Sequence, residues 1–196
     1  MQKAKTSNPK PNAKVVWGVV MTRRFGLHVL LVATMVATIG CDRVTKRLAT
    51  DALAGSSGRS YLADMVRLEY AENRGGFLSV GETLPPAWRQ AVFVGGTGLL
   101  LIAVVGAAIR YPRREIARAG LAFFVAGGLS NLVDRVAHGR VVDFLVIRVG
   151  PIHTGVFNVA DVAIMIGLAL LVLAEMTRAG RPAGPGADLH PDRTGL

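Results

Sequence analysis

Two aspartates occur in apolar surroundings in the second half of the chain, where a charged side chain has no local reason to be. Asp143 lies in the stretch RVVDFLVI, and Asp161 follows FNVA near the start of another apolar segment. An acidic side chain within a membrane span costs about 2.5 to 3.5 kcal/mol, so it usually marks a function or a paired interior. Two carboxyl groups held close together share a proton, and one then acts as a base towards water while the other acts as an acid. The pair therefore favours hydrolysis of the aspartic-protease type.

Polar side chains at helical spacing accompany both aspartates. Asn158 precedes Asp161 by three residues, so on a helix it would lie on the same face and could bond to its carboxyl group. Asn131 and Arg135 are four residues apart, with the small Gly127 one turn earlier, so they form one polar stripe with a close-packing position. The pattern predicts that these groups surround the pair.

Other polar residues have a structural alternative. Asp134 beside Arg135 or Arg140 is typical of an ion pair that only supports the fold. Lys46 could extend its side chain to the membrane surface, as lysines near span ends do. Asn73, in ENRGG, could be a turn residue. Ser130, His138 and His153 have no catalytic neighbour in the sequence and are interpreted as packing or loop residues.

The composition is that of a membrane protein built as one compact unit. Of the 196 residues, 51% are hydrophobic and 18% are charged, and the mean hydropathy is +0.41, which is too apolar for an ordinary soluble domain of this size. One cysteine and four scattered histidines form no metal-binding pattern, so we expect neither a metal nor another cofactor. The net charge of +10 lies at the ends of apolar runs without interleaved aromatics, so nucleic acid is not an expected partner.

Four apolar stretches, at about residues 25–41, 91–109, 119–133 and 155–174, are long enough or nearly long enough to cross a bilayer. Basic residues predominate in the tail 1–24 and in the connection after the second stretch, but not in the segments 42–90 and 134–154. By the positive-inside rule, both chain termini are expected in the cytoplasm and both of those segments outside. Residues 177–196, rich in Pro and Gly, are interpreted as a disordered cytoplasmic tail.

The segment 42–90 is too long to be a simple connection. Within it, MVRLEYAENRGGFLSV alternates apolar and charged residues, then turns at ENRGG and resumes with Phe77 and Leu78. This pattern predicts a strand, a turn and a second strand. Because open sheet edges are not tolerated in lipid, the sheet should lie at the outer membrane surface. The expected fold is a mainly α membrane protein with four spans, 25–176, and a small outer β element.

Two other interpretations compete at this point. If translation began at Met21, the segment ending in Ile-Gly-Cys would be a lipoprotein export signal, with Cys41 as the lipid-bearing residue. This hypothesis leaves three further apolar stretches in a supposedly soluble protein. Alternatively, the acids could carry protons or a cation through a small transporter. That hypothesis gives no reason for an outer sheet, and the four stretches show no inverted repeat.

The chain resembles the bacterial lipoprotein signal peptidases, or signal peptidase II family. Four motifs occur in the family's order between residues 42 and 161: DRVTK, NRGGFLS, GGLSNLVDRVAHGRVVDF and FNVAD. Each is weak alone, but together their order and spacing on a four-span chain are specific. The resemblance implies a monomeric aspartic endopeptidase of the bacterial inner membrane, in contact with membrane lipid. Its substrates would be prolipoproteins, from which it would cut the signal peptide before a diacylglyceryl-modified cysteine.

By position, the resemblance assigns the catalytic pair to Asp143 and Asp161. It also assigns residues that shape or support the site, and these are Asp42, Lys46, Asn73, Gly75, Asn131, Arg135, Asn158 and Ala160. Asp134 matches as a structural partner. The chain departs from the family in the second motif, where Leu78 stands at a position usually occupied by Phe. This departure leaves the two aspartates untouched but affects the expected contact between that loop and the substrate.

Overall fold

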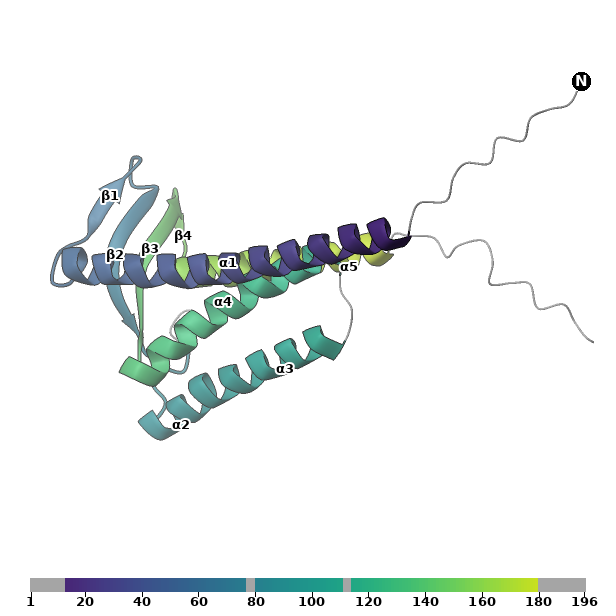
Figure 1. Cartoon of the computed structure of the whole chain (residues 1–196). Coiled ribbons are helices and arrows are strands. Elements are labelled where there is room, and N and C mark those ends of the chain that lie inside the picture. Colours follow the sequence, from purple (N-terminus) through teal and green to yellow (C-terminus); the bar gives the residue numbers. More distant parts are fainter. Residues whose placement is uncertain (1–12, 77–79, 111–113, 180–196) are drawn as a thin grey trace, which may run out of the picture.

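The computed structural model describes residues 13–76, 80–110 and 114–179 (Figure 1). Four helical stretches in this part are long and apolar enough to cross a membrane. They are Phe25–Leu53, Pro86–Arg110, Glu115–His138 and Val159–Arg178. The prediction of four spans with a small sheet is confirmed, although the boundaries of every span differ from those expected.

Helix α1, Ala13–Leu53, is much longer than the predicted span 25–41. At about 1.5 Å per residue its 41 residues extend roughly 60 Å, twice the thickness of the hydrocarbon core. No proline interrupts it, and the polar residues after Cys41 continue the helix. Residues 13–24, expected as part of a tail, are therefore helical, and Asp42 and Lys46 lie inside a helix instead of opening a loop. The helix is unbroken at the exposed Cys41.

The second span begins with a proline and contains a π-helical turn. It consists of α2, Pro86–Gln90, the π-helix η2, Ala91–Gly96, and α3, Thr97–Arg110. Pro86 is suited to the first helical turn, where its missing N–H would have no partner in any case. π-Turns within helices are often found at functional sites. This one carries Phe93, which faces the site described below.

Helix α4, Glu115–His138, is the central helix and contacts α1, α3 and α5. It continues five residues beyond the predicted span and ends at Gly139, which adopts a left-handed conformation with φ 68°. Its closest neighbour is α5, Val159–Ala179. A Cβ atom built on Gly127 would lie 2.3 Å from the carbonyl oxygen of Ala160, so only glycine allows this approach of the two helices.

Helix α5 starts four residues later than expected. Residues 155–158 are not helical, and Asp161 is the third residue of the helix instead of lying well inside it. The reason is that Asn158 caps the helix with its side chain, as described below. Residues 180–196, predicted to be a disordered tail, lie outside the described residues, whereas residues 177–179 belong to α5.

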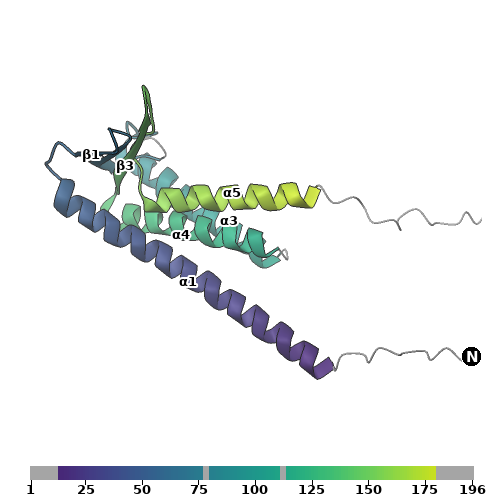
Figure 2. The ribbon, with the colours of Figure 1, turned by 90° about the horizontal axis from the view of Figure 1, so that it is seen from above.

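A four-stranded antiparallel sheet covers one end of the helices, far from the start of α1 (Figures 1 and 2). Its strands, in the order β1-β2-β3-β4, are Arg59–Tyr61, Val66–Asn73, Val141–Val149 and Ile152–His153. The strand predicted before the turn at ENRGG is confirmed as β2, although it continues to Asn73, into the predicted turn. Strand β2 pairs with β3 on one side, and its first three residues pair with β1 on the other. The second predicted strand, at Phe77 and Leu78, falls on residues 77–79, which lie outside the described part.

The tight contact between α4 and α5 gives a stability prediction. We expect Gly127→Ala to destabilise the protein by about 1 to 3 kcal/mol, because the new methyl group meets backbone that cannot move independently. Gly106→Ala on α3 is the matched control, since its Cβ would have no atom within 4 Å. Thermal unfolding in detergent should show a lower midpoint for Gly127→Ala alone. Equal midpoints for both variants would contradict the packing account.

Candidate active site

Asp143 and Asp161 come from a strand and a helix that meet beneath the sheet. Asp143 is the third residue of β3 and its side chain is 3% exposed, whereas Asp161 lies in the first turn of α5 and is half-buried. Both oxygens of Asp143 accept hydrogen bonds, from Asn158 Nδ2 at 2.6 Å and from Asn73 Nδ2 at 3.0 Å. The fold therefore brings together the two aspartates that the sequence singled out.

Asn158 connects the two carboxyl groups and is completely buried. Its side-chain oxygen accepts the backbone N–H of Asp161 at 3.0 Å, while Asp161 Oδ2 accepts the backbone N–H of Asn158 at 3.1 Å. This reciprocal arrangement is a capping box, which satisfies two unpaired donors at the start of α5. The amide group of Asn158 remains free to bond to Asp143. The same residue thus starts the helix and fixes the orientation of both aspartates.

Asn131 supports Asp161 from α4. Its Nδ2 donates to Asp161 Oδ1 at 2.8 Å, and its Oδ1 accepts from Lys46 Nζ at 2.9 Å and from Asn158 Nδ2 at 3.3 Å. Asn73, the last residue of β2, supports Asp143 and also accepts the N–H of Gly75 at 3.0 Å. Asn73 is therefore a strand residue whose side chain bonds both to the turn that follows and to the carboxyl group of Asp143.

Burial raises the pKa of Asp143 from 3.8 to about 6. Loss of water around the carboxyl group is the largest cause, and the nearby charge of Asp161 raises the pKa further. The hydrogen bonds from Asn73 and Asn158 act in the opposite direction, because they stabilise the ionised form. Asp143 therefore exchanges a proton much closer to neutral pH than an exposed aspartate does.

A buried ion cluster joins α1, α4 and α5 behind the aspartates. Lys46 is 5% exposed, and its Nζ lies 2.7 Å from Asp42 Oδ2 and 2.7 Å from Asp134 Oδ2. Asp134 also pairs with Arg43, which reaches the carbonyl oxygen of Ser130. Lys46 therefore does not extend to the membrane surface, and that alternative is wrong. Asp134 does form ion pairs, but with Arg43 and Lys46 on α1 instead of with Arg135 or Arg140.

Asp42 stabilises the start of α5 from α1. Its carboxyl group has no exposed surface, and it accepts the backbone N–H of Ala160 at 2.8 Å and the hydroxyl of Ser130 at 2.7 Å. The contribution of Ala160 is thus its backbone, and its buried methyl group leaves room for the close helix contact. Ser130, which the sequence left as a packing residue, and Arg43 are members of this network that sequence reasoning missed. The sequence indicates them only by position, because Ser130 lies one helical turn before Asp134 and Arg43 directly follows Asp42.

Arg135 lies beside the aspartates but bonds to backbone. It donates to the carbonyl oxygen of Gly75 at 2.9 Å and to that of Asn131 at 3.4 Å, and its guanidinium lies 6.0 Å from the centre of the Phe93 ring. It therefore holds the turn after Asn73 against α4. Leu78, the departure from the family motif, lies outside the described residues.

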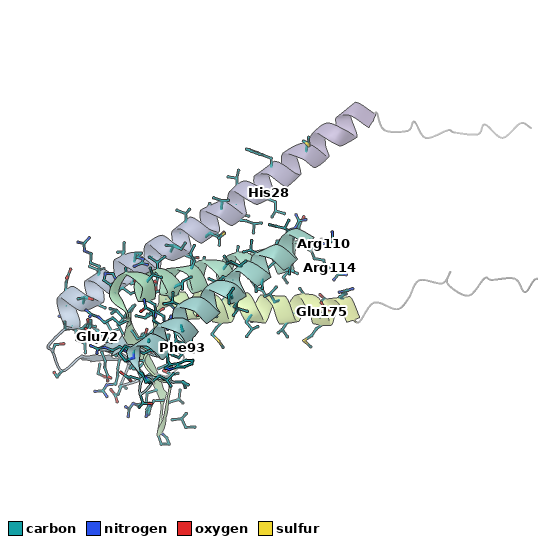
Figure 3. All side chains as sticks on the ribbon, turned by 90° about the horizontal axis from the view of Figure 1, so that it is seen from below. His28, Glu72, Phe93, Arg110, Arg114 and Glu175 are labelled. Carbon is teal, nitrogen blue, oxygen red and sulfur yellow. The ribbon has the colours of Figure 1, made fainter. Side chains whose placement is uncertain are left out.

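A cavity of about 630 Å³ opens beside the aspartates. Asn73, Asn131, Arg135, Asp143 and Asp161 form its polar end. Most of the remaining wall is apolar and comes from η2, α5 and the segment before α5, with Phe93, Val162, Met165 and Ile166 as examples. Figure 3 shows Phe93 at the sheet end of the molecule. The cavity therefore joins a hydrogen-bonded acidic pair to an apolar surface.

Comparison with known proteins identifies the family of this chain. The family model for signal peptidase (SPase) II matches residues 34–177. The chain belongs to the signal peptidase II family. The lipoprotein signal peptidase of Moorella thermoacetica is 35% identical over 77% of this chain and 94% of that protein, and the one from Syntrophotalea carbinolica is 31% identical over 74% and 89%. Membership in a peptidase family leaves the transporter alternative without support.

Two solved structures of bacterial membrane enzymes share the fold of this family member. One has a TM-score of 0.69 at 22% identity and covers 80% of this chain and 93% of its own. The other has a TM-score of 0.64 at 24% identity and covers 75% and 92%. The fold of this chain therefore occurs in experimentally determined structures of membrane enzymes.

The buried ion cluster predicts a strong effect of removing one charge. We expect Asp42→Asn to cost about 3 to 5 kcal/mol of folding free energy, because it unbalances charges that have no access to water. Glu175→Gln is the control, since it breaks an ion pair with Arg178 on the surface of α5. Unfolding by denaturant in lipid micelles measures both variants. A loss of stability in Asp42→Asn no larger than in the control would contradict the role of the cluster.

Proposed function

We propose that this chain is a membrane-embedded aspartic endopeptidase that removes signal peptides from prolipoproteins, cutting before a diacylglyceryl-modified cysteine. The family assignment and the lipoprotein signal peptidases among its relatives support the substrate class. The catalytic type rests on one observation, the pair of carboxyl groups that Asn158 connects at the polar end of the cavity. Water is the nucleophile in this chemistry, and no covalent enzyme intermediate forms.

In the proposed reaction the two aspartates hold one proton between them. The ionised carboxylate removes a proton from a water molecule, whose oxygen then attacks the carbonyl carbon of the scissile peptide bond. The protonated carboxyl group hydrogen-bonds to the developing oxyanion and then gives its proton to the leaving amine. The C–N bond breaks, and the pair again holds one proton. The asparagines keep both groups oriented throughout.

The apolar wall of the cavity accounts for a substrate that remains in the membrane. Val162, Met165 and Ile166 on α5 offer an apolar surface at the depth of the aspartates. A signal helix and acyl chains can occupy such a surface without leaving a lipid-like environment. The scissile bond then lies at the polar end, where Arg135 and the asparagines line the wall. Membrane lipid and the prolipoprotein are the partners in this proposal.

The proposed orientation places both termini in the cytoplasm and the sheet outside. Arg110 and Arg114 lie at the end of the helices opposite to the sheet (Figure 3), and the tail 1–24 carries six basic residues and no acidic one. Such positive charge is retained on the cytoplasmic side. We also propose a monomer, because the two aspartates and all their hydrogen-bond partners described above belong to one chain.

The catalytic assignment predicts the effect of two conservative substitutions. We expect Asp143→Asn and Asp161→Asn each to lower cleavage on the order of 10³-fold or more, because each removes a proton-transfer group but keeps the shape of the site. Asp51→Asn, at an exposed position of α1, is the control. A lipid-modified reporter, scored for loss of its signal peptide in cells depleted of their own enzyme, measures all three. Near-normal processing by either aspartate variant would refute the catalytic assignment.

The raised pKa of Asp143 gives a pH prediction. Rate should fall as pH rises past the range in which the pair keeps its proton, so the alkaline limb should lie well above the normal aspartate range. In Asn73→Ala, Asp143 loses a hydrogen bond that favours ionisation, so its pKa should rise further. The alkaline limb of kcat against pH should then move to higher pH. A limb that stays in place or moves to lower pH would contradict this account.

A further inference from the structure

The hydrogen bonds of the site distinguish the two aspartates from each other. An asparagine side chain has an oxygen that only accepts and an NH₂ group that only donates, and its orientation must be deduced from its neighbours. A neighbour that can only donate, such as a lysine ammonium or a backbone N–H, determines which end faces it. The opposite end of the amide then determines whether the next group donates or accepts a hydrogen bond. All three asparagines of this site have such a neighbour.

Asn131 takes its orientation from a buried cation. Its Oδ1 lies 2.9 Å from Lys46 Nζ, so its NH₂ group must face Asp161 Oδ1, at 2.8 Å. The remaining two protons of the ammonium group point to Asp42 and Asp134, which leaves Lys46 no freedom to turn away. Asp161 Oδ2 in turn accepts a backbone N–H. Both oxygens of Asp161 therefore accept from donors that cannot reverse.

The asparagines around Asp143 take their orientation from neutral groups instead. The backbone N–H of Asp161 fixes Asn158, and the backbone N–H of Gly75 fixes Asn73. Within the described residues, no cation donates to Asp143 either directly or through one amide. The two carboxyl groups thus differ in their distance from a buried positive charge, because Lys46 reaches Asp161 through one amide, Asn131, but reaches Asp143 only through two, Asn131 and Asn158.

We propose that Lys46 is a positioning residue which, through Asn131, keeps Asp161 ionised as the base and leaves the shared proton on Asp143. This inference rests on the proposed function and assigns roles within it. The proton then starts on Asp143 and passes to the leaving amine, while Asp161 takes a proton from water. The roles are fixed before substrate arrives, because the network needs nothing from the substrate.

The surrounding charges agree with one proton on the pair. Within the cluster, the positive charges of Arg43 and Lys46 balance the negative charges of Asp42 and Asp134. From α4, Arg135 is the further cation that lines the cavity with the two aspartates. One ionised aspartate balances Arg135, whereas two would leave a net negative charge in a largely apolar site. Burial that raises the pKa of Asp143 to about 6 favours the same distribution.

The test compares two cations that share one partner. Lys46→Met removes the charge connected to Asn131, while Arg43→Met removes the other cation bound to Asp134 and leaves Asn131 untouched. Both should lower thermal stability. We expect Lys46→Met alone to lower kcat about 100-fold or more with KM within threefold, and to move the acid limb of kcat against pH upward by about one unit or more. Equal pH profiles for wild type and Lys46→Met would overturn the proposal.

A second pair of variants applies if Lys46→Met does not fold. Asn131→Asp keeps the size and the acceptor for Lys46 but loses the donor to Asp161, whereas Asn131→Leu loses both. We expect the acid limb of kcat against pH to move upward in both variants, and further in Asn131→Asp, because its new carboxylate adds a negative charge beside Asp161. Identical pH profiles for the two variants would also overturn the proposal.

Infrared spectra separate this proposal from the proposed function, because they do not require activity. Difference spectra between pH 5 and pH 8 should contain the C=O band of a buried protonated carboxyl group. We expect the band to be lost in Asp143→Asn and kept in Asp161→Asn. Loss in Asp161→Asn instead would reverse the roles and overturn the proposal even if both aspartates are essential. Normal cleavage by both variants would instead refute the proposed function.

Discussion

A single buried asparagine joins the helix that carries one aspartate to the strand that carries the other. Asn158 has no exposed surface, so each of its polar groups needs a partner, and its backbone N–H and both ends of its side-chain amide are used to place Asp143 and Asp161. Because the capping box starts α5, forming the helix and forming the site are one event. Two other features place the same groups. The close contact at Gly127 holds α4 against the start of α5, and the sheet register sets Asp143 opposite Ala71.

The ion cluster behind the site also holds the start of α5 in place. Asp42, Lys46 and Asp134 are buried charges, and they persist because each is paired and hydrogen-bonded. Their pairing connects α1 to α4 and, through the backbone of Ala160, to the first turn of α5. Helix α1 continues past Cys41, where the sequence predicts the end of its span, and so carries Asp42 and Lys46 to this cluster. The site is thus braced from three helices and the sheet, and its groups have little freedom to reorganise during a reaction.

Much of this arrangement was predictable from the sequence, because acids are rare in apolar segments. That rarity singled out Asp143 and Asp161, and apolar length identified the four spans. Partners were harder to predict, because pairing across helices depends on distances that no local pattern encodes. Arg135 follows Asp134 directly but faces a different direction, so Asp134 pairs with Arg43 and Lys46. The strand at residues 66–73 was clear from its alternation, yet its partner β3 lies some 70 residues away. The sequence pattern places Asn158 inside the last span, whereas in the structure its side chain accepts the N–H of Asp161 and α5 starts after it.

The central claim is that two aspartates activate a water molecule without forming a covalent bond to the substrate. A single turnover with excess enzyme in H₂¹⁸O, followed by mass spectrometry of both the released signal peptide and the enzyme, tests it directly. The account predicts one ¹⁸O atom in the new carboxyl group of the signal peptide and none in Asp143 or Asp161. Incorporation of ¹⁸O into either aspartate would contradict it, because that label would show a covalent intermediate on the enzyme.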